Sequence, residues 1–269
     1  MLKQMLEDRV AVVTGAGQGI GLGIAGHFGR EGARVVIGEL VPERGERAAG
    51  ELKAKGYRAQ DLQLDVTEPD SCTALVEAVL AEHGRIDVLV NSAGLFIPHK
   101  SEEQPEADWR LQIDIMLNGV FFMTQAVVRA AMISQRAGSV VSIASIGGMG
   151  GWPMRAAYNA AKAGVITLNE VLAAEWAQYN IRLNCVSPGV TRTTMVDRAI
   201  KEGAARLDLY NGRTPIGRLA KVEEIADTVL FLASDRASYI TGENLRVDGG
   251  WVPWGNLNAV GFPEKIPDG

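Results

Sequence analysis

Short apolar runs alternate with longer stretches of helical periodicity from one end of the chain to the other. Five of these runs are rich in Val and Ile and almost free of charge, which is typical of strands buried on both faces of a parallel sheet. Two further runs, 59–64 and 244–248, are weaker strand candidates. The expected strands, in chain order, are 10–14, 34–37, 59–64, 86–91, 139–145, 181–186 and 244–248.

The stretches between these strands predict amphipathic helices. In 68–83, for example, Leu75, Ala78 and Val79 recur at helical spacing, and Glu82 falls off that face. The expected helices are 20–30, 43–55, 68–83, 106–134, 156–178 and 222–233. This alternation predicts right-handed βαβ units in a doubly wound α/β sheet of about seven parallel strands, with helices on both faces. Ligands of such sheets bind at the carboxyl ends of the strands.

The composition favours one folded unit. The 269 residues are 47% hydrophobic and 22% charged, a balance that excludes a disordered chain. No linker, charge block or internal repeat divides the sequence. We therefore expect a single domain over 1–269, with a core of 9–250 and a tail of 251–269.

Charge and cysteine content restrict the possible partners. A net charge of −5 excludes a nucleic-acid binder driven by bulk positive charge, and it argues against an anionic membrane surface. Cys72 and Cys185 are too few for a secreted disulfide scaffold, so we expect reduced, packed thiols. Lys3 and Glu7 interrupt any apolar signal segment, and the longest uncharged run, 137–154, is too rich in Gly for a membrane helix. These features predict a cytoplasmic protein.

The first expected strand ends in a glycine-rich segment, TGAGQGIG over 14–21, that leads directly into a helix. A strand, a glycine loop and a helix N-terminus form a phosphate cradle, because glycines permit a tight turn and the helix offers free N–H groups. The fitting pattern is T-G-x-x-x-G-x-G, whereas the G-x-G-x-x-G match at 21–26 lies inside the helix. Glycines at plain turns are the alternative, but the flanking strand and helix favour a nucleotide.

The second expected strand leads to Glu39, whose carboxylate can accept hydrogen bonds from both adenosine ribose hydroxyls. This carboxylate would repel a 2′-phosphate, and neither Gln18 nor Leu40 would bind one, so the sequence predicts NAD rather than NADP. Arg44 lies near enough to keep NADP open. An exposed carboxylate at the start of a loop is the alternative reading of Glu39.

Two more strand ends suit the same ligand. Asp65, followed by Val66, can accept from the adenine amino group. Asn91-Ser92-Ala93-Gly94 forms a turn of small residues that lets the backbone pass beside the cofactor. Together these strand ends predict a dinucleotide across one edge of a Rossmann-type sheet.

Tyr158 and Lys162 place a phenol and an ammonium at positions i and i+4 of an expected helix, which share one face. The pKa of a free phenol lies near ~10, and an adjacent cation moves it toward neutrality, where proton transfer is efficient. An ordinary surface Tyr–Lys pair is the alternative. Ser145 ends the fifth strand at the same edge and could hold a substrate oxygen, or could be a solvated loop serine, whereas Ser142 falls inside the strand.

Taken in order, these segments resemble the short-chain dehydrogenase/reductase family, in its single-domain branch, over 9–250. Each motif is weak alone, but the ordered set is highly specific. The motifs are Thr14-Gly15-x-x-x-Gly19-x-Gly21, Asn91-Ser92-Ala93-Gly94, Asn118, Ser145, Tyr158-x-x-x-Lys162 and Pro188-Gly189-x-x-x-Thr193.

The resemblance implies an oxidoreductase with a nicotinamide cofactor, commonly a homotetramer. It implies that Tyr158 is the general acid/base, that Ser145 orients the substrate, and that Lys162 lowers the pKa of Tyr158 and binds the nicotinamide ribose. By position, Asn118 would support a water-linked proton relay; a helix-surface amide is the alternative, and the following Gly119 predicts a local kink. The implied cofactor residues are Gly15, Gln18, Gly19, Ile20, Glu39, Asp65, Val66, Asn91, Ala93, Gly94, Tyr158, Lys162, Pro188, Gly189, Val190 and Thr193.

Two departures from the family pattern are visible. Ser92 stands where the family usually has Asn, and its small side chain should pack in the same space. The tail after Gly250 carries Trp251, Trp254 and Phe262. It is expected either to cap the core or to contact a neighbouring subunit.

The substrate pocket is less clearly specified. The segment 194–213 predicts a lid of short helices. Besides Ser145 and Tyr158, the candidate pocket walls, each of which could instead be core or interface, are Phe96, Ile97, Met149, Trp152, Val190 and Met195. Arginines that could meet an anionic substrate, although a solvated face is the simpler expectation, are Arg192, Arg198, Arg206 and Arg213. No metal is expected, because no ligand spacing connects His27, His83 and His99.

Three functions fit these observations. The first is an NAD-linked dehydrogenase of a small secondary alcohol, such as a polyol or sugar. The second is an NADPH-linked reductase of carrier-bound 3-oxoacyl chains, which the same family contains; Glu39, Gln18 and the net charge speak against it. The third is a non-catalytic NAD-binding regulator, against which the intact Ser145, Tyr158 and Lys162 speak.

Overall fold

The computed structural model describes residues 4–201 and 206–254, without the side chains of Met195 and Ala199. Seven parallel strands form one sheet in the order β3-β2-β1-β4-β5-β6-β7. The predicted doubly wound α/β sheet is therefore confirmed. The strands are β1 Val10–Thr14, β2 Arg34–Glu39, β3 Arg58–Gln63, β4 Val88–Asn91, β5 Gly138–Ile143, β6 Ile181–Pro188 and β7 Asn244–Val247.

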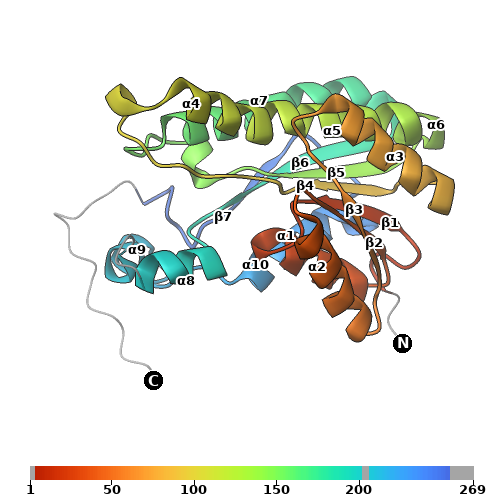
Figure 1. Ribbon diagram of the computed structural model, residues 1–269, viewed down its shortest axis with the longest axis horizontal. Helices are drawn as coiled ribbons and strands as arrows, with labels where there is room; N and C mark the ends of the chain where they lie inside the picture. The colour runs from red at the N-terminus through yellow and green to blue at the C-terminus, as the bar shows by residue number, and fades with distance from the viewer. Residues whose placement is uncertain (1–3, 202–205, 255–269) are drawn as a thin grey trace.

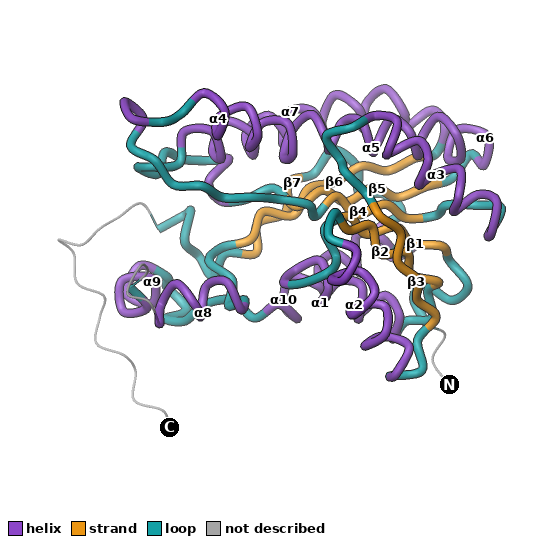
Figure 2. The backbone as a smooth tube through the Cα atoms, in the orientation of Figure 1, coloured by secondary structure: helices purple, strands orange, loops and turns teal. Residues whose placement is uncertain are grey.

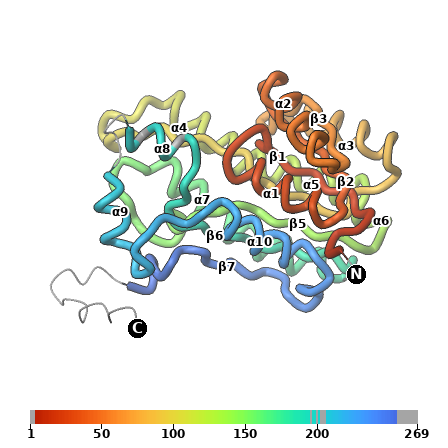
Figure 3. Tube along the Cα trace, turned by 90° about the horizontal axis from the view of Figure 1, so that it is seen from below, coloured from red at the N-terminus to blue at the C-terminus, as the bar shows by residue number. Residues whose placement is uncertain are grey.

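Helices cover both faces of the sheet (Figure 1). One layer contains α1, α2 and α10, and the opposite layer contains α3 to α7; Figure 3 shows the first layer in front of the strands. The short helices α8 and α9 lie apart from both layers at one end of the sheet. The helices are α1 Gly19–Arg30, α2 Pro42–Ala54, α3 Pro69–His83, α4 Glu106–Ile113, α5 Gly119–Val127, α6 Ile133–Gln135, α7 Ala156–Trp176, α8 Thr194–Lys201, α9 Leu207–Arg213 and α10 Val222–Ala233.

The apolar strand runs are buried because alternate side chains enter different cores. In β1, Ala11 and Val13 pack in the cluster beneath α1 and α10, whereas Val10 and Val12 pack in the cluster on the opposite face. All five residues of β1 are buried. The edge strands β3 and β7 are only partly buried, which explains their weaker apolar signal in the sequence.

The strand order reverses between β1 and β4, because β2 and β3 lie on one side of β1 and β4 to β7 lie on the other. This is the switch point at which doubly wound sheets bind their ligands. The loops that follow β1, β4, β5 and β6 all leave the carboxyl edge of the sheet (Figure 2). The fold therefore gathers the predicted chemical groups at one edge.

The predicted long helix over 106–134 is a continuous helical run from α4 to α6, interrupted by π-helical turns at Asp114–Asn118 and Val128–Met132. By length and hydropathy, Glu106–Gln135 could cross a membrane. In this fold it is a core helix, because Met116, Met123 and Val127 are fully buried.

The cysteines are free and buried, as predicted. Burial raises the pKa of Cys72 to about 11 and that of Cys185 to about 12. Both thiols therefore stay protonated at neutral pH and act as small apolar side chains.

Candidate active site

The glycine loop after β1 adopts conformations that require glycine. Gly15 and Gly19 have φ angles of +62° and +60°. A Cβ atom at Gly15 would lie 2.6 Å from Ala93 Cα, so this glycine lets the loops after β1 and β4 touch. A Cβ atom at Gly19 would meet only the methyl group of Thr193 within 4 Å, at 3.9 Å. The space over Gly19, at the start of α1, is thus left open for a ligand.

The rival glycine motif inside α1 has a packing role. A Cβ atom at Gly23 would collide with Val222 of α10, and one at Gly26 would contact Leu52 of α2. These glycines let α1 pack closely against its two neighbours in the layer. The cradle is therefore formed by the T-G-x-x-x-G-x-G segment, in which Gln18 immediately precedes α1 and Ile20 lies in its first turn.

Gly15→Ala should weaken cofactor binding at least about tenfold, because a left-handed non-glycine residue costs roughly 1–2 kcal/mol and the methyl group would displace the loop at Ala93. The measurement is NAD titration together with thermal unfolding. Gly50→Ala is the matched control, since Gly50 lies within α2 with nothing within 4 Å of an added Cβ. That change should leave binding intact and stabilise the helix by up to about 1 kcal/mol. Equal NAD affinity in both variants would contradict the role given to Gly15.

Glu39 lies against the glycine loop rather than in solvent. Its side chain is buried, and Oε2 accepts a 3.0 Å hydrogen bond from the Gly17 backbone N–H. The Glu39 carboxylate is thereby fixed beside the cradle, where the sequence predicts the adenosine ribose. Two arginines lie close by: an added Cβ at Gly17 would be 2.9 Å from Arg44 Cβ, and Arg47 Nη2 lies 3.5 Å from the Gly17 carbonyl oxygen. Sequence reasoning named Arg44 and missed Arg47, whose only signal was its place one turn later on α2.

The loop after β4 is fastened to β1 by Thr14, whose Oγ1 accepts hydrogen bonds from the Ser92 and Ala93 N–H groups at 3.0 and 3.1 Å. Asn91 faces the core, where its amide donates to Thr124 and Ser142. Any contact between Asn91 and a cofactor must therefore use its backbone. Ser142 is buried inside β5, as predicted.

The loop after β3 places Asp65 and Val66 at the same edge. The Asp65 carboxylate accepts from the backbone N–H and the hydroxyl of Thr67 at 2.9 and 2.7 Å. Val66 is buried against Gly119, where an added Cβ would lie 2.8 Å from its methyl group. The Asp65 side chain is therefore held in place, and Val66 packs the loop onto α5.

Ser145 and Tyr158 come together although they lie on different elements. Ser145 follows β5 by two residues and caps a short 3₁₀ turn, where its Oγ accepts from the Gly147 N–H at 3.0 Å. Its hydroxyl lies close enough to the Tyr158 phenol to oppose the rise in that group's pKa. An added Cβ at Gly147 would lie 3.4 Å from both Ser145 Oγ and Tyr158 Cε1. Glycine at this position therefore lets the turn approach the phenol.

Lys162 lies one turn after Tyr158 on α7 and is buried, with 5% of its surface exposed. Its Nζ donates a 2.6 Å hydrogen bond to the Ile143 carbonyl at the end of β5 and lies 5.9 Å from the centre of the Tyr158 ring. Gly148 permits this packing, because an added Cβ would lie 2.7 Å from the Lys162 carbonyl carbon. Desolvation lowers the pKa of Lys162 to about 8.

Lys162 is not among the groups that lower the pKa of Tyr158 in this structure, so its expected effect on the phenol stays a prediction. Burial raises the pKa of Tyr158 above its ordinary value, and the groups that oppose this are the Ser145 hydroxyl and the Arg155 guanidinium. The Lys162 ammonium is buried and donates its hydrogen bond to the Ile143 carbonyl. A cofactor beside the pair would change this environment.

Lys162→Met should raise the free energy of unfolding of the cofactor-free protein more at pH 7 than at pH 10. Because the pKa of folded Lys162 is about 8 against an ordinary 10.5, folding penalises its charged form fully below about pH 8, and the penalty fades as the pH rises toward 10.5. The pH-dependent part should be roughly 1–3 kcal/mol. Urea unfolding at both pH values measures it, with exposed Lys53→Met on α2 as the control. If Lys162→Met changed the free energy of unfolding by the same amount at both pH values, the claim that folding buries a charged ammonium at Lys162 would be refuted.

Asn118 is not brought to Ser145 and Tyr158 by any hydrogen bond in the described chain. Its amide donates to Asp114 Oδ1 at 2.7 Å on its own helix. Met116, two residues earlier and so on the opposite side of the helix, is fully buried, and its sulfur would lie 3.9 Å from a Cβ at Gly94. Met116 therefore faces the predicted cofactor loop. The expected kink is present as the π-helical turn that Asn118 ends, and the part of Asn118 in a water-linked relay stays a prediction.

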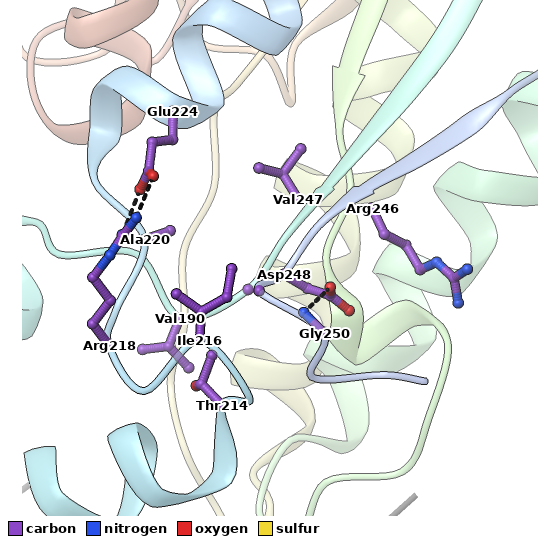
Figure 4. Close-up of a pocket in the computed structure, with 12 residues that line it drawn as sticks. Val190, Thr214, Ile216, Arg218, Ala220, Glu224, Arg246, Val247, Asp248 and Gly250 are labelled. Carbon is purple, nitrogen blue, oxygen red and sulfur yellow. Dashed lines mark hydrogen bonds and ion pairs between the residues drawn. The ribbon is translucent and has the colours of Figure 1, made fainter. Parts of the chain in front are cut away.

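The loop after β6 runs beside the turn that follows β7. Pro188 ends the strand, and an added Cβ at Gly189 would lie 2.9 Å from Asp248 Cα. Gly189 and Val190 line a cavity of about 330 Å³ between the strand ends of β6 and β7 and the segment 214–220 (Figure 4). In Figure 4, Arg218 and Glu224 pair across one side of it. Ser145, Tyr158 and Lys162 do not line this cavity, so it is separate from these three side chains.

The residues predicted to line the substrate pocket contact different parts of the structure. Phe96 contacts the Tyr158 ring edge-on, with centroids 5.5 Å apart, and Trp152 stacks on Trp251 at 5.0 Å. Met149 instead faces β7, where its sulfur lies 3.3 Å from Asn244 Nδ2. The side chain of Met195 and the whole of Phe262 lie outside the described residues. In its described part, the segment predicted to be a lid contains the short helices α8 and α9, and its action as a lid stays a prediction.

The histidines make local contacts. His99 lies 2.7 Å from Asp108, His27 lies 3.3 Å from Asp227, and His83 contacts Gln60. In the described ranges no group of three or more His, Cys, Asp or Glu side chains could hold a metal.

The known proteins that this chain resembles include reductases and dehydrogenases. A family model described as Enoyl-(Acyl carrier protein) reductase matches residues 15–252. The chain is 41% identical to the 3-oxoacyl-(acyl-carrier-protein) reductase FabG of Thermotoga maritima over 247 residues, 92% of this chain and 99% of that protein. It is 37% identical to an NAD-dependent glycerol dehydrogenase of Listeria innocua, over 92% of this chain and 95% of the relative. A crystal structure of a gluconate 5-dehydrogenase from Burkholderia cenocepacia, in complex with NADP and tartrate, is 34% identical and matches with a TM-score of 0.88 over 93% of this chain and 98% of that one.

Proposed function

Because this chain belongs to the short-chain dehydrogenase/reductase family and is thus an oxidoreductase of CH–OH groups, we propose that it is NAD-dependent and interconverts a small secondary alcohol and its ketone. A polyol or sugar-like alcohol is the proposed substrate class. The observation that carries the proposal is the meeting of Ser145 and Tyr158 at the strand edge that also holds the glycine cradle and Glu39.

The residues present fit a dinucleotide. The open space over Gly19, the free end of α1 and the fixed Glu39 carboxylate suit a pyrophosphate and its neighbouring ribose. Gly15, Asp65, Ala93, Gly94 and the loop after β6 would hold the remainder. The bound nicotinamide supplies the acceptor or donor of hydride.

The chain supplies the proton chemistry. In the oxidative direction the Tyr158 phenolate takes the proton of the substrate hydroxyl, while the Ser145 hydroxyl donates a hydrogen bond to the same oxygen. In the reverse direction the Tyr158 phenol protonates the alkoxide. Lys162, fixed by the Ile143 carbonyl, would bind the nicotinamide ribose with its ammonium. The burial of these side chains limits the access of water, which could otherwise compete for the proton.

A specific observation favours a second candidate, an NADPH-dependent reductase of carrier-linked 3-oxoacyl chains. The FabG relative is named for that reaction, and Arg44 and Arg47 lie near the ribose side of the cradle. The buried Glu39 carboxylate and the net charge of −5 oppose a 2′-phosphate and an acidic carrier protein.

An absorbance screen for NADH and NADPH separates the two candidates, using polyols, sugars, steroids and 3-oxoacyl thioesters with both cofactors. The proposal expects turnover of a secondary alcohol with NAD. Exclusive turnover of 3-oxoacyl thioesters with NADPH would replace it with the second candidate. Binding of NAD without any turnover would favour a regulator.

The proposal includes a cytoplasmic, single-domain chain that assembles as a homotetramer, as the family commonly does. Light scattering after gel filtration measures the assembly, and a mass of four chains of 28.8 kDa is expected. A stable monomer would contradict it.

A further inference from the structure

An unpaired arginine lies beside the proton-transfer tyrosine. The guanidinium carbon of Arg155 lies 4.4 Å from the centre of the Phe96 ring and 4.8 Å from that of Trp152. Within residues 4–201 and 206–254, no carboxylate forms an ion pair with it. This arginine is only partly exposed, so aromatic rings hold its charge without neutralising it.

Two arginines near this end of the molecule do form ion pairs with carboxylates. Arg192 lies 2.9 Å from Asp197, and Arg218 lies 2.6 Å from Glu224. Acidic side chains outnumber basic ones in this chain of net charge −5, so the absence of an ion pair at Arg155 does not reflect a shortage of carboxylates.

A second cation reinforces the first. Trp152 stacks on Trp251 with centroids 5.0 Å apart, and the guanidinium carbon of Arg213 lies 4.8 Å from the Trp251 ring. Arg213 donates a hydrogen bond to the Trp251 carbonyl at 3.0 Å and has no carboxylate partner in the part of the chain that is described. Two guanidinium groups thus flank one tryptophan pair, and their field attracts anions.

Rings that pack on a guanidinium leave its N–H groups available for contact with a ligand. The guanidinium carbon of Arg155 lies over the Phe96 and Trp152 rings, and a guanidinium carries its N–H donors in one plane. That edge matches a carboxylate, which accepts two parallel hydrogen bonds. Because the rings already restrict the side chain, less rotational freedom is lost on binding.

Arg155 is close enough to Tyr158 to act on the same ligand. It lies three residues before Tyr158, about one helical turn, and Phe96 contacts both side chains. Lys162 lies one turn on the other side and is directed at the Ile143 carbonyl. The Arg155 charge also lowers the pKa of Tyr158 against the effect of burial. Arg155 is thus on the side of the phenol opposite the lysine.

We propose that Arg155 binds a carboxylate of the substrate, so that the alcohol oxidised at Tyr158 is a hydroxy acid whose carboxylate lies a few bonds from the reacting carbon. This narrows the proposed function and rests on it for turnover. Phe96 and Trp152 orient the guanidinium, and Trp251 with Arg213 forms the outer wall of the same site.

Matched acid and amide pairs test this specificity. The probes are gluconate and gluconamide, 3-hydroxybutyrate and 3-hydroxybutyramide, and 4-hydroxycyclohexanecarboxylate and its carboxamide. The wild-type protein should prefer the acid of a turned-over pair by about ten- to a hundredfold in kcat/KM, the range for hydrogen bonds to a charged group. R155Q should remove that preference and change kcat/KM for the amide less than about threefold, while R155K should retain part of it.

Arg236→Gln is the matched control, because it removes an exposed arginine after α10, away from the strand edge that holds Tyr158. It should leave the preference unchanged. An equal rate with acid and amide in the wild-type protein, or an equal loss for both in R155Q, would overturn the proposal.

A binding experiment keeps the test independent of turnover. Cyclohexanecarboxylate has no hydroxyl group to oxidise, and its binding should quench the fluorescence of Trp152 and Trp251 with NADH present; cyclohexanecarboxamide should not. R155Q should abolish this response. If no alcohol is turned over but the acid still binds through Arg155, the proposed function fails and the anion site stands. If the acid is turned over or bound no better than the amide, the anion site fails while an alcohol dehydrogenase remains.

Discussion

Tyr158→Phe is expected to lower kcat for alcohol oxidation by about 10³-fold, within the range of 10²–10⁴ that general acid–base catalysis supplies. The change removes one hydroxyl and preserves the ring that contacts Phe96 edge-on. NAD affinity should change less than about threefold, because the cradle is formed by the loops after β1 and β4 and not by the phenol. Stopped-flow and steady-state rates measure the first quantity, and fluorescence titration of NAD measures the second.

The matched control is Tyr179→Phe, which removes the same atom just beyond the far end of α7. It should leave kcat unchanged. Turnover by Tyr158→Phe at more than a tenth of the wild-type rate would show that another group moves the proton. Parallel loss of NAD binding would mean that the phenol is part of the cofactor site.

The fold could be predicted from the sequence because its signals are local. Val10 and Val12 alternate with Ala11 and Val13, and both sets are buried, so a continuous apolar run indicates a central parallel strand. The helix after the glycine loop could likewise be predicted from the residues next to it in the sequence. The strand limits moved by a few residues, as for β5, which ends at Ile143 rather than 145. Pairing with neighbouring strands, which no local pattern contains, sets these ends.

The cofactor residues could be predicted where a strand end implies a position. Glu39 follows β2 and does lie against the glycine loop. What the pattern cannot show is that the Gly17 N–H fixes this carboxylate, or that Arg47 reaches the same loop. Those contacts depend on how α2 packs beside the glycine loop, which is a matter of tertiary structure.

Roles that depend on side-chain direction were harder to predict. Asn118 and Met116 lie two positions apart and so face different sides of the helix; Met116 is buried, whereas the Asn118 amide donates to Asp114. The pKa of Tyr158 depends on burial, which opposes the effect of a nearby cation. Spacing gives the pair Tyr158 and Lys162 but not the desolvation of either group.

The contacts of the tail also lay beyond sequence reasoning. Trp152 and Trp251 are about one hundred residues apart in the chain and stack in the structure. The sequence suggested only that Trp251 caps the core or contacts another subunit. The described part supports a cap for Trp251, because this ring packs on the loop before α7 of its own chain.

Replacement of Glu39 is expected to change the choice of cofactor by a large factor. In the wild-type protein the ratio of kcat/KM for NAD to that for NADP should exceed about tenfold, because like charges near 4 Å repel by about 1–4 kcal/mol and each 1.4 kcal/mol is a factor of ten. Glu39→Gln removes the charge and keeps an oxygen for the Gly17 N–H, so the ratio should fall toward one. Glu39→Arg adds a third guanidinium beside Arg44 and Arg47 and should reverse the preference.

A control variant distinguishes the effect of the Glu39 charge from that of another negative charge nearby. Glu43→Gln, in the first turn of α2, removes the same charge four residues later and should leave the ratio unchanged. Raising the salt concentration should weaken the discrimination by Glu39 only partly, because a buried carboxylate is screened less than an exposed one. A ratio that is the same in the wild-type protein, Glu39→Gln and Glu39→Arg would show that Glu39 only holds the glycine loop. The two arginines on α2 would then be free to bind a 2′-phosphate, and the NADPH-linked alternative would gain its main physical support.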